Sequence, residues 1–505
     1  MPLAAALAEL GDAQRRALLE RVHPLYTAFT HAWRILFDAL EGTGGFLSGE
    51  YLWKYPREED KDFIARQEQA RYHNYAKTLV NIYVRYAFHG GVTRTTADRD
   101  LDVWWNDVDG AGTKINDFMK RVTRIALAIS HAGILIDKEA GAPTGPTRAE
   151  DTARVLALVQ TPLSILDWRT ARNGMTLTYA KFREAVAADP VGPSDLEAED
   201  DEAFSYLLWD DTEWARYDAL GTEVDRDTHD LGRVPLVMLR PEPSSQYPFL
   251  GQPLFGNANV LRAIYNRCSE EDEVLRNSSF SMLGVSVSDT AGPEGVARAK
   301  TDLGQDIGTT RAIVVQGAID YKTPDQTVPG AIRDNIAFLI QEVYRMAHVF
   351  YQRDTRDTET AEAIKLKHNE LQEMLLGVVE ENERAEREMA YLFFLWREPN
   401  DAAAKTRFEA AQVQVQYPRE FFVSDMAADL DKWAKGIALD LGKTMTTVLK
   451  KQAARSLAPA LDAATRKTID SEIDAQPAQQ DVVPYPVGAG AGDRGGPGRR
   501  AIAAP

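Results

Sequence analysis

The sequence contains a single cysteine, Cys268, in 505 residues. One thiol can neither form a disulfide within the chain nor hold a metal ion through several thiolates. We therefore expect a fold that does not depend on oxidation, with Cys268 as a small buried helix residue.

Long hydrophobic runs are also missing. The longest apolar stretches, at residues 125–129 and 134–136, are far shorter than the roughly 20 residues that a membrane-spanning helix needs. The N-terminus has no basic region, and Glu9 and Asp12 interrupt it before the apolar part of a secretion signal could form. The sequence thus predicts no membrane partner, and any passage of material through this protein would use an aqueous hole.

The chain lacks the excess of basic charge that is typical of a simple nucleic-acid binder. It has 58 lysines and arginines against 76 acids, which gives a formal net charge of −18. Such a chain is not expected to attract DNA phosphates in a sequence-independent way.

At 505 residues the chain is long enough for three or four domain-sized units, and 44% of its residues are hydrophobic. Apolar residues recur at helical spacing over residues 12–40, where Pro24 predicts a break. Further helices are expected after this segment. We expect those helices to begin near Asp60 and to span 72–88 and 117–129, before a short strand at 134–137. From 162 to 240 the pattern changes to short strands, at residues 163–168, 175–179, 203–209, 213–217 and 234–239. The fold class we predict is α+β, mainly helical.

Residues 255–397 have a distinctive order. A polar helix at 255–281 precedes short strands and turns at 282–330, with strands expected at 285–288, 311–316 and 319–322. A helix at 331–351 and a charged break at 352–357 follow, and Thr358 can cap a helix of about 38 residues that ends at Arg397. Its narrow apolar stripe suits packing between neighbouring chains. We expect its many glutamates to face solvent or a lumen, namely Glu359, Glu362, Glu370, Glu373, Glu380, Glu381, Glu383, Glu386 and Glu388.

The C-terminal part is expected to begin with a strand at 410–417. Helices at 424–441 and 444–473 follow, the second interrupted near Pro459. Residues 475–505 are rich in Gly, Pro, Ala and Gln without apolar periodicity, so we predict a disordered tail.

No local motif for catalysis, metal binding or a cofactor withstands inspection of its spacing. Residues 436–444 resemble a phosphate-binding P-loop, but five residues separate the glycines where that motif has four, and a helix rather than a strand precedes them. Residues 105–110 resemble a calcium loop with Trp105 at the first ligand position, so a polar turn fits better. None of the eight histidines has a partner at the i, i+4 spacing of a helical metal pair.

The order of segments in residues 45–474 resembles a tailed-bacteriophage portal protein. The likeness is carried by Tyr51 to Pro56 with the acids after it, Asp107 to Thr113, His131 to Asp137, Val234 to Val237, the helix after Gly256-Asn257, and Thr358 to Ala363. It implies a ring of about twelve subunits at one capsid vertex in the virion, with wing, stem, clip and crown regions around a channel for double-stranded DNA.

The resemblance also implies a division of the chain. Residues 1–254 would form the N-terminal helical and α/β wing, 255–281 and 331–351 the two stem helices, 282–330 the clip and 352–357 the tunnel loop. Residues 358–397 would be a long wing helix, 398–474 a wing strand and the helical crown, and 475–505 the disordered tail.

Two sets of site residues follow from this division. The DNA-facing tunnel loop would contain Gln352, Arg353, Asp354, Thr355, Arg356 and Asp357. The clip would face the terminase large subunit and later the head-completion adaptor proteins, through Asp289, Glu294, Arg298, Lys300, Asp302 and Asp306. The ring would also meet the major capsid and scaffolding proteins. In such systems the terminase hydrolyses ATP, so the portal itself needs no nucleotide.

For Arg353 and Arg356 a solvated loop, salt-bridged to neighbouring subunits, remains an equally good interpretation. For the whole chain, an alternative is a cytosolic nucleotide-dependent enzyme that uses residues 436–444, and a third option is a helical scaffold protein without a channel. Nucleotide titration separates the enzyme from the others, and only the portal interpretation requires annular particles.

Overall fold

The structure is a computed structural model, and it describes residues 10–475 apart from several gaps. The gaps are residues 57, 140–152, 173, 175, 186–203, 230, 257, 280–282, 288–291, 303–311, 317–326, 350–360, 399, 420, 422–434, 437–441 and 458–462. The chain divides into two compact units at residue 421, and each is described by itself. No helix in the described residues is both long and apolar enough to cross a membrane.

The first unit begins with helices, and all of them except those at residues 44–48 and 99–104 were predicted from the periodicity. They are α2 (Asp12–Glu20), α3 (Pro24–Glu41), α4 (Gly44–Ser48), α5 (Asp60–Gln69), α6 (Tyr75–Ala87), α7 (Arg99–Trp104) and α8 (Ile115–Ile129). The break expected at Pro24 is confirmed, because Pro24 opens α3 at a position where its missing N–H costs no hydrogen bond. Gly42, at φ 75°, ends α3 in the left-handed conformation that favours glycine.

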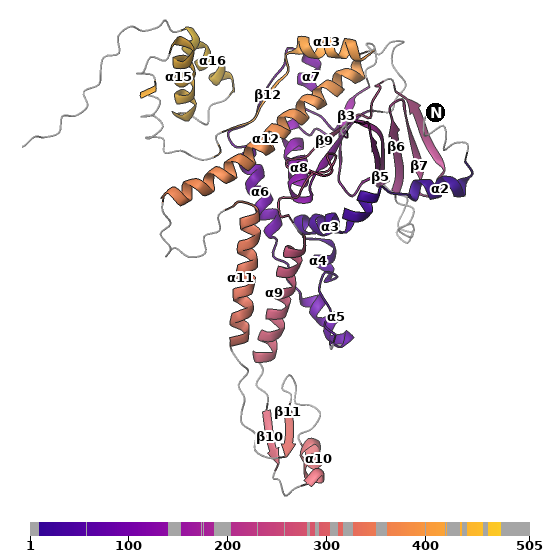
Figure 1. Ribbon diagram of the computed structural model, residues 1–505, viewed down its shortest axis with the longest axis vertical. Helices are drawn as coiled ribbons and strands as arrows, with labels where there is room; N and C mark the ends of the chain where they lie inside the picture. Colours follow the sequence, from indigo (N-terminus) through magenta and orange to yellow (C-terminus); the bar gives the residue numbers. More distant parts are fainter. Residues whose placement is uncertain are drawn as a thin grey trace, which may run out of the picture. The chain divides into compact units, whose positions relative to one another are not determined.

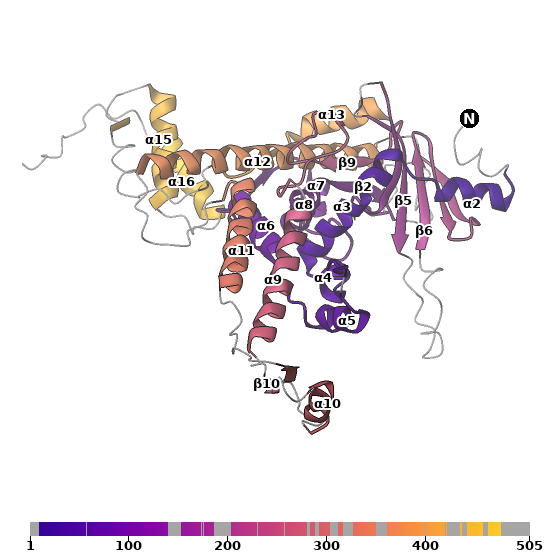
Figure 2. The ribbon, with the colours of Figure 1, turned by 60° about the horizontal axis from the view of Figure 1, so that its bottom comes forward.

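Two antiparallel sheets follow (Figures 1 and 2). In the smaller one, β2 (Ala132–Lys138) lies between β3 (Val155–Gln160) and β9 (Leu236–Leu239). The larger one is a five-stranded meander of β4 (Ile165–Thr170), β5 (Leu177–Ala185), β6 (Phe204–Asp210), β7 (Glu213–Asp218) and β8 (Glu223–Thr228). The strand pattern of this region is confirmed, but β3 and β8 were not predicted. β8 has four charged residues and is almost wholly exposed, so its sequence lacks the alternation of apolar and polar residues that predicts a strand.

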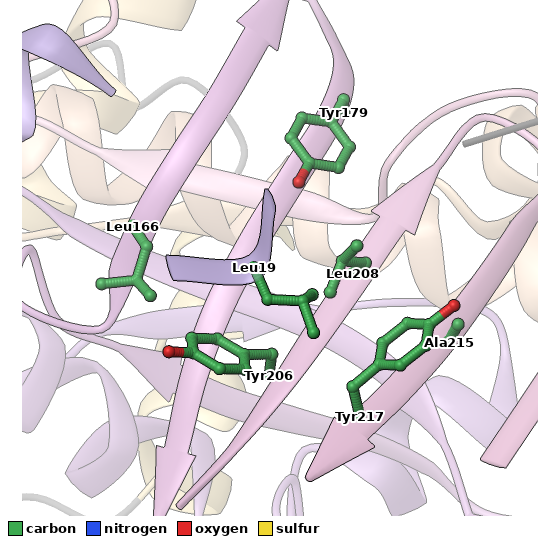
Figure 3. Close-up of a cluster of buried hydrophobic side chains, with 7 residues drawn as sticks. All are labelled: Leu19, Leu166, Tyr179, Tyr206, Leu208, Ala215 and Tyr217. Carbon is green, nitrogen blue, oxygen red and sulfur yellow. The ribbon is translucent and has the colours of Figure 1, made fainter. Parts of the chain in front are cut away.

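Helix α2 is attached to the five-stranded sheet by apolar and polar contacts. Leu19 is buried against Leu166, Tyr206, Leu208 and other side chains of strands β4 to β7 (Figure 3). The Lys181 ammonium of β5 donates to the carbonyl oxygens of Leu18, Leu19 and Arg21 at the C-terminal end of α2. These carbonyls have no partner within the helix, so a buried cation there satisfies them.

The region after β9 has the predicted helix–insert–helix order. Its elements are α9 (Ala258–Ser279), β10 (Leu283–Val287), α10 (Gly292–Asp302), β11 (Ala312–Gln316) and α11 (Thr327–Met346). β10 and β11 pair in parallel, Leu283 opposite Ala312 through Val287 opposite Gln316. Parallel neighbours need a crossover connection, and α10, which was not predicted, lies in that connection. The strand expected at 319–322 falls outside the described residues.

The long helix α12 (Ala361–Arg397) ends where the sequence predicts. The next prediction is wrong in part, because 410–411 belong to helix α13 (Asp401–Ala411) and the strand β12 covers only Gln414–Gln416. Asn400 caps α13 by accepting from the Ala403 N–H at 2.9 Å. β12 pairs antiparallel with β1 (Thr93–Thr95), which joins distant parts of the chain.

In the second unit, α15 (Lys443–Leu457) and α16 (Ala463–Ala475) contact each other. Lys451 of α15 lies 2.7 Å from an Asp474 carboxylate oxygen of α16. The helix expected at 424–441 lies almost wholly outside the described residues, as do Pro459 and residues 476–505.

We expect the first unit to lose stability in acid because of His131, which immediately precedes β2. Its Nδ1 lies 2.8 Å from the Ser130 hydroxyl, and burial lowers its pKa from 6.5 to about 3. Between these values the unfolded chain binds a proton that the folded one does not, so stability falls as pH falls. From pH 7 to pH 4 this linkage amounts to about 3 kcal/mol.

The check is urea unfolding of wild type and His131→Gln at pH 7 and pH 4. The wild type should lose about 3 kcal/mol more than the variant. Asp137 contributes in the opposite sense in both proteins, because burial raises its pKa to about 6. His89→Gln changes an exposed histidine and is the matched control for the substitution. Equal losses in all three proteins would contradict the role of His131.

Candidate functional site

The candidate site is the α9–α11 helix pair and the segment that supports it. The two helices contact each other, and Leu261 and Ile264 of α9 are buried, as are Ile336 and Ile340 of α11. The N-terminal half of α9 is the buried half of that helix. At the C-terminal end of α11, the Tyr83 hydroxyl donates to the Ala347 carbonyl at 2.7 Å and fixes this end in place. The pair is therefore anchored at one end, and the β10–α10–β11 insert follows α9 at the other (Figure 1).

Residues 44–71, which we call the brace segment, are bound to α9 by buried polar groups. Asn266 is completely buried, and its side chain accepts from the Trp53 N–H at 2.7 Å and donates to the Tyr51 carbonyl at 3.0 Å. The Arg262 guanidinium donates to the same carbonyl at 2.9 Å. Polar residues of α9 that resemble a solvated face in the sequence are thus positioning groups for irregular backbone.

Arg66 holds the brace segment together from inside. It is 3% exposed, and its guanidinium donates to both Glu58 carboxylate oxygens at 2.7 and 2.8 Å and to the Trp53 carbonyl at 2.6 Å. The guanidinium carbon also lies 4.7 Å from the Tyr55 ring centre and 5.4 Å from that of Phe63. The hydrogen bonds from Arg66 lower the pKa of Glu58, which keeps this carboxylate charged.

The run of acids on α9 is neutralised by its surroundings. Glu271 pairs with Arg333 of α11, and Asp272 pairs with Arg71 of the brace segment. Glu270 accepts from the Tyr55 hydroxyl and pairs with Arg267, and Glu273 pairs with Arg276. Glu271, Asp272 and, through Tyr55, Glu270 therefore tie α9 to α11 and to the brace segment, whereas the Glu273–Arg276 pair lies within α9.

The expectation that the glutamates of α12 face solvent or a lumen holds only in part. Glu370, Glu373 and Glu380 are exposed, whereas Glu381, Glu383 and Glu388 are half-buried and bound by arginines or backbone N–H groups. Glu386 is 1% exposed, so for it the expectation is wrong. The side chains of Glu359 and Glu362 lie outside the described residues. The apolar stripe is likewise buried within its own unit from Leu371 to Trp396, not offered to a neighbour.

Glu386 belongs to a buried network that joins three distant segments. Arg94 of β1 donates to its two carboxylate oxygens at 2.6 and 2.7 Å, and the Tyr417 hydroxyl donates to one of them. Burial and then the charge of Glu386 raise the pKa of Tyr417 well above its ordinary value, so the phenol stays a donor. The network fixes α12 to the β1–β12 pair.

Most of the site residues expected from the sequence cannot be located. All six tunnel-loop residues, 352–357, lie outside the described part of the chain, as do Asp289 and Asp306. Glu294 and Arg298 lie on α10 with exposed side chains, four residues apart. Lys300 and Asp302 are on the same helix, but their side chains are not described.

The motifs that the sequence made doubtful do not form sites in the described residues. Asp107 accepts from the Gly112 N–H, and Asp109 accepts from the N–H groups of Ala111 and Thr113, so this is a polar turn as predicted. Most of the P-loop-like stretch lies outside the described residues, and α15 begins directly after Gly442. The described residues contain no group of three or more ligating side chains suited to a metal ion.

Comparisons with known proteins give weak structural likenesses. No family model matches the chain, and no curated protein matches it. One solved chain, described as "Neck of empty GTA particle computed with C6 symmetry", is 11% identical, with a TM-score of 0.36, over 78% of this chain and 94% of its own. Another, "Virion of native gene transfer agent (GTA) particle", is 10% identical, with a TM-score of 0.33, over 82% and 98%. Likenesses of this size do not establish a shared fold.

Proposed function

We propose that this chain is the subunit of a portal ring at the unique vertex of a phage-like capsid. The observation that carries the proposal is the anchored α9–α11 pair with a small β–α–β insert between its helices and the long α12 after it. In this proposal α9 and α11 are the stem, β10–α10–β11 is the clip, and α12 crosses the wing. Double-stranded DNA would enter through the ring during packaging and leave through it during ejection.

The charge of the chain suits a channel through which DNA slides. DNA carries a negative charge about every 1.7 Å of its axis, so a basic wall would hold it by releasing counterions. A chain with a net charge of −18 gives a ring that repels DNA overall, and a few basic side chains then suffice as transient contacts. Glu294 and Arg298, exposed on α10, are the described candidates for contact with the terminase and then with adaptor proteins.

The proposed contact with DNA at the narrowest point is the tunnel loop, residues 352–357. We expect Arg353→Glu combined with Arg356→Glu to leave ring assembly intact and to reduce the packaging or retention of DNA, because two transient cationic contacts become repulsive. Packaged DNA per particle is the measurement, and rings are counted in the same preparation. Packaging at the wild-type level would remove this role from the loop.

Imaging of the purified chain tests the proposal as a whole. Negative-stain images should contain annular particles with a central hole, and mass photometry should give a mass near twelve times 56.2 kDa, the mass expected of a ring of about twelve copies. Assemblies without a hole would contradict the proposal. A scaffold protein or a nucleotide-dependent enzyme has no need of such a hole.

A further inference from the structure

Helix α2 is held on the five-stranded sheet by few contacts. Leu19 is the one buried residue of this nine-residue helix, and it packs against the sheet (Figure 3). The Arg15 guanidinium donates to the Gly221 carbonyl at 3.1 Å, and the Lys181 ammonium binds carbonyls at the C-terminal end of the helix. A helix of this length is marginally stable by itself, so α2 depends on these contacts and on residues 21–23, the joint that connects it to α3.

His23 fastens this joint to two elements at once. Its backbone N–H donates to the Leu166 carbonyl of β4 at 2.9 Å, and its ring stacks on Trp168 of the same strand, with the ring centres 4.0 Å apart. Its Nδ1 accepts from the Leu25 N–H at 3.1 Å, which caps α3. The position of the chain between α2 and α3 is therefore set by one half-buried side chain.

The cap requires the neutral imidazole. A protonated Nδ1 is a donor and cannot accept from the Leu25 N–H, and an imidazolium would place a positive charge at the positive end of the α3 dipole. The charged ring can still stack on Trp168, so a proton acts on the cap more than on the stack. Burial lowers the pKa of His23, and the nearby charge of Asp167 opposes this shift in part.

The neighbouring charged groups do not replace His23 as the titrating group of the joint. Burial lowers the pKa of Lys181 to about 8, so its ammonium is charged at pH 5 and at pH 7, with Asp167 and Arg21 as the charges that face it. The Trp168 ring stacks on Phe249, whose ring centre lies 6.5 Å from that of His131. Burial lowers the pKa of His131 to about 3, so this second histidine is neutral at both pH values.

We propose that α2 is an acid-released strap, in which protonation of His23 uncaps α3, loosens the joint from β4 and lets α2 lift from the sheet. The side chains that Leu19 covers would then be exposed, namely Leu166, Tyr179, Tyr206, Leu208, Ala215 and Tyr217. Below the ordinary histidine pKa of 6.5 the open form binds a proton that the closed form does not, so the closed form loses stability as pH falls. This device does not depend on the proposed ring.

Hydrogen exchange of the full chain at pH 7 and pH 5 tests the strap. Protection factors, which correct for the chemical exchange rate, should fall in α2 by about three- to thirtyfold from pH 7 to pH 5, because opening takes up one proton. Strand β2 exchanges through unfolding of the whole unit and gives the baseline. An equal fall in α2 and β2, or no fall in α2, would overturn the inference.

Three variants assign the effect to the cap. His23→Asn keeps a side-chain acceptor that does not titrate, so α2 should be equally protected at both pH values. His23→Lys has a fixed charge and no acceptor, so α2 should already exchange at pH 7 as wild type does at pH 5. His31→Asn changes an exposed histidine of α3 and should behave like wild type.

The same variants can also contradict the proposal. An acid-dependent loss in His23→Asn would show that another group titrates. Wild-type protection of α2 in His23→Lys at pH 7 would show that the cap does not hold the strap. Low protection in His23→Asn at pH 7 would mean that the stack on Trp168, and not the cap, holds the joint, which also overturns the inference.

Discussion

Replacing Arg94 by alanine should lower the free energy of unfolding of the first unit by about 3–5 kcal/mol at pH 7. In this variant Glu386, which is 1% exposed, loses its cation, and the Tyr417 hydroxyl remains as the donor to its carboxylate among the described residues. A buried charge without a partner costs far more than the ion pair contributes, because the desolvation of the carboxylate is no longer offset. Urea unfolding followed by tryptophan fluorescence measures the loss.

Two variants give this prediction its controls. Arg94→Ala combined with Glu386→Gln removes the charge as well as its partner, so a large part of the loss should be recovered. Arg387→Ala removes an exposed arginine of the same helix and should change stability by less than about 0.5 kcal/mol. If the double variant were as unstable as Arg94→Ala, the loss would come from packing and not from the orphaned carboxylate.

The sequence predicts the order of the helices of the candidate site but not all of their bounds, since α11 covers Thr327–Met346 where a helix at 331–351 was expected. The expected range 255–281 contains α9 at Ala258–Ser279, and α12 ends at Arg397 as expected. Residues 401–411 were missed although a signal existed, since Asn400 is a good N-cap and alanines follow it. β8 offered no comparable signal, because its side chains are almost all polar.

The partners of charged residues could not be predicted in the same way. A dense series of glutamates on one helix is usually solvated, and nothing local to α12 contradicts that interpretation. Glu386 is bound by Arg94, which is 292 residues away in the chain, and Glu388 is bound by Arg233, 155 residues away, in addition to Arg384 on its own helix. Which acids become buried is decided by tertiary structure, and therefore Arg66 and Asn266 also escaped the sequence analysis.

Arg66→Ala should cause the second large loss, concentrated in the brace segment. The change takes from Glu58, whose side chain is 12% exposed, the cation that is hydrogen-bonded to both of its carboxylate oxygens, and it deprives the Trp53 carbonyl of its donor. The free energy of unfolding should again fall by about 3–5 kcal/mol. The loss is smaller if residues 51–69 detach locally from α9 instead of the whole unit unfolding. Hydrogen exchange should therefore accelerate in this segment while α8 and β2 remain protected.

The matched control is Arg71→Ala, which removes a largely exposed partner of Asp272 from the same segment. An exposed ion pair contributes about 1 kcal/mol or less, so this variant should exchange like wild type. Exchange of the brace segment at the wild-type rate in Arg66→Ala would contradict this role of Arg66.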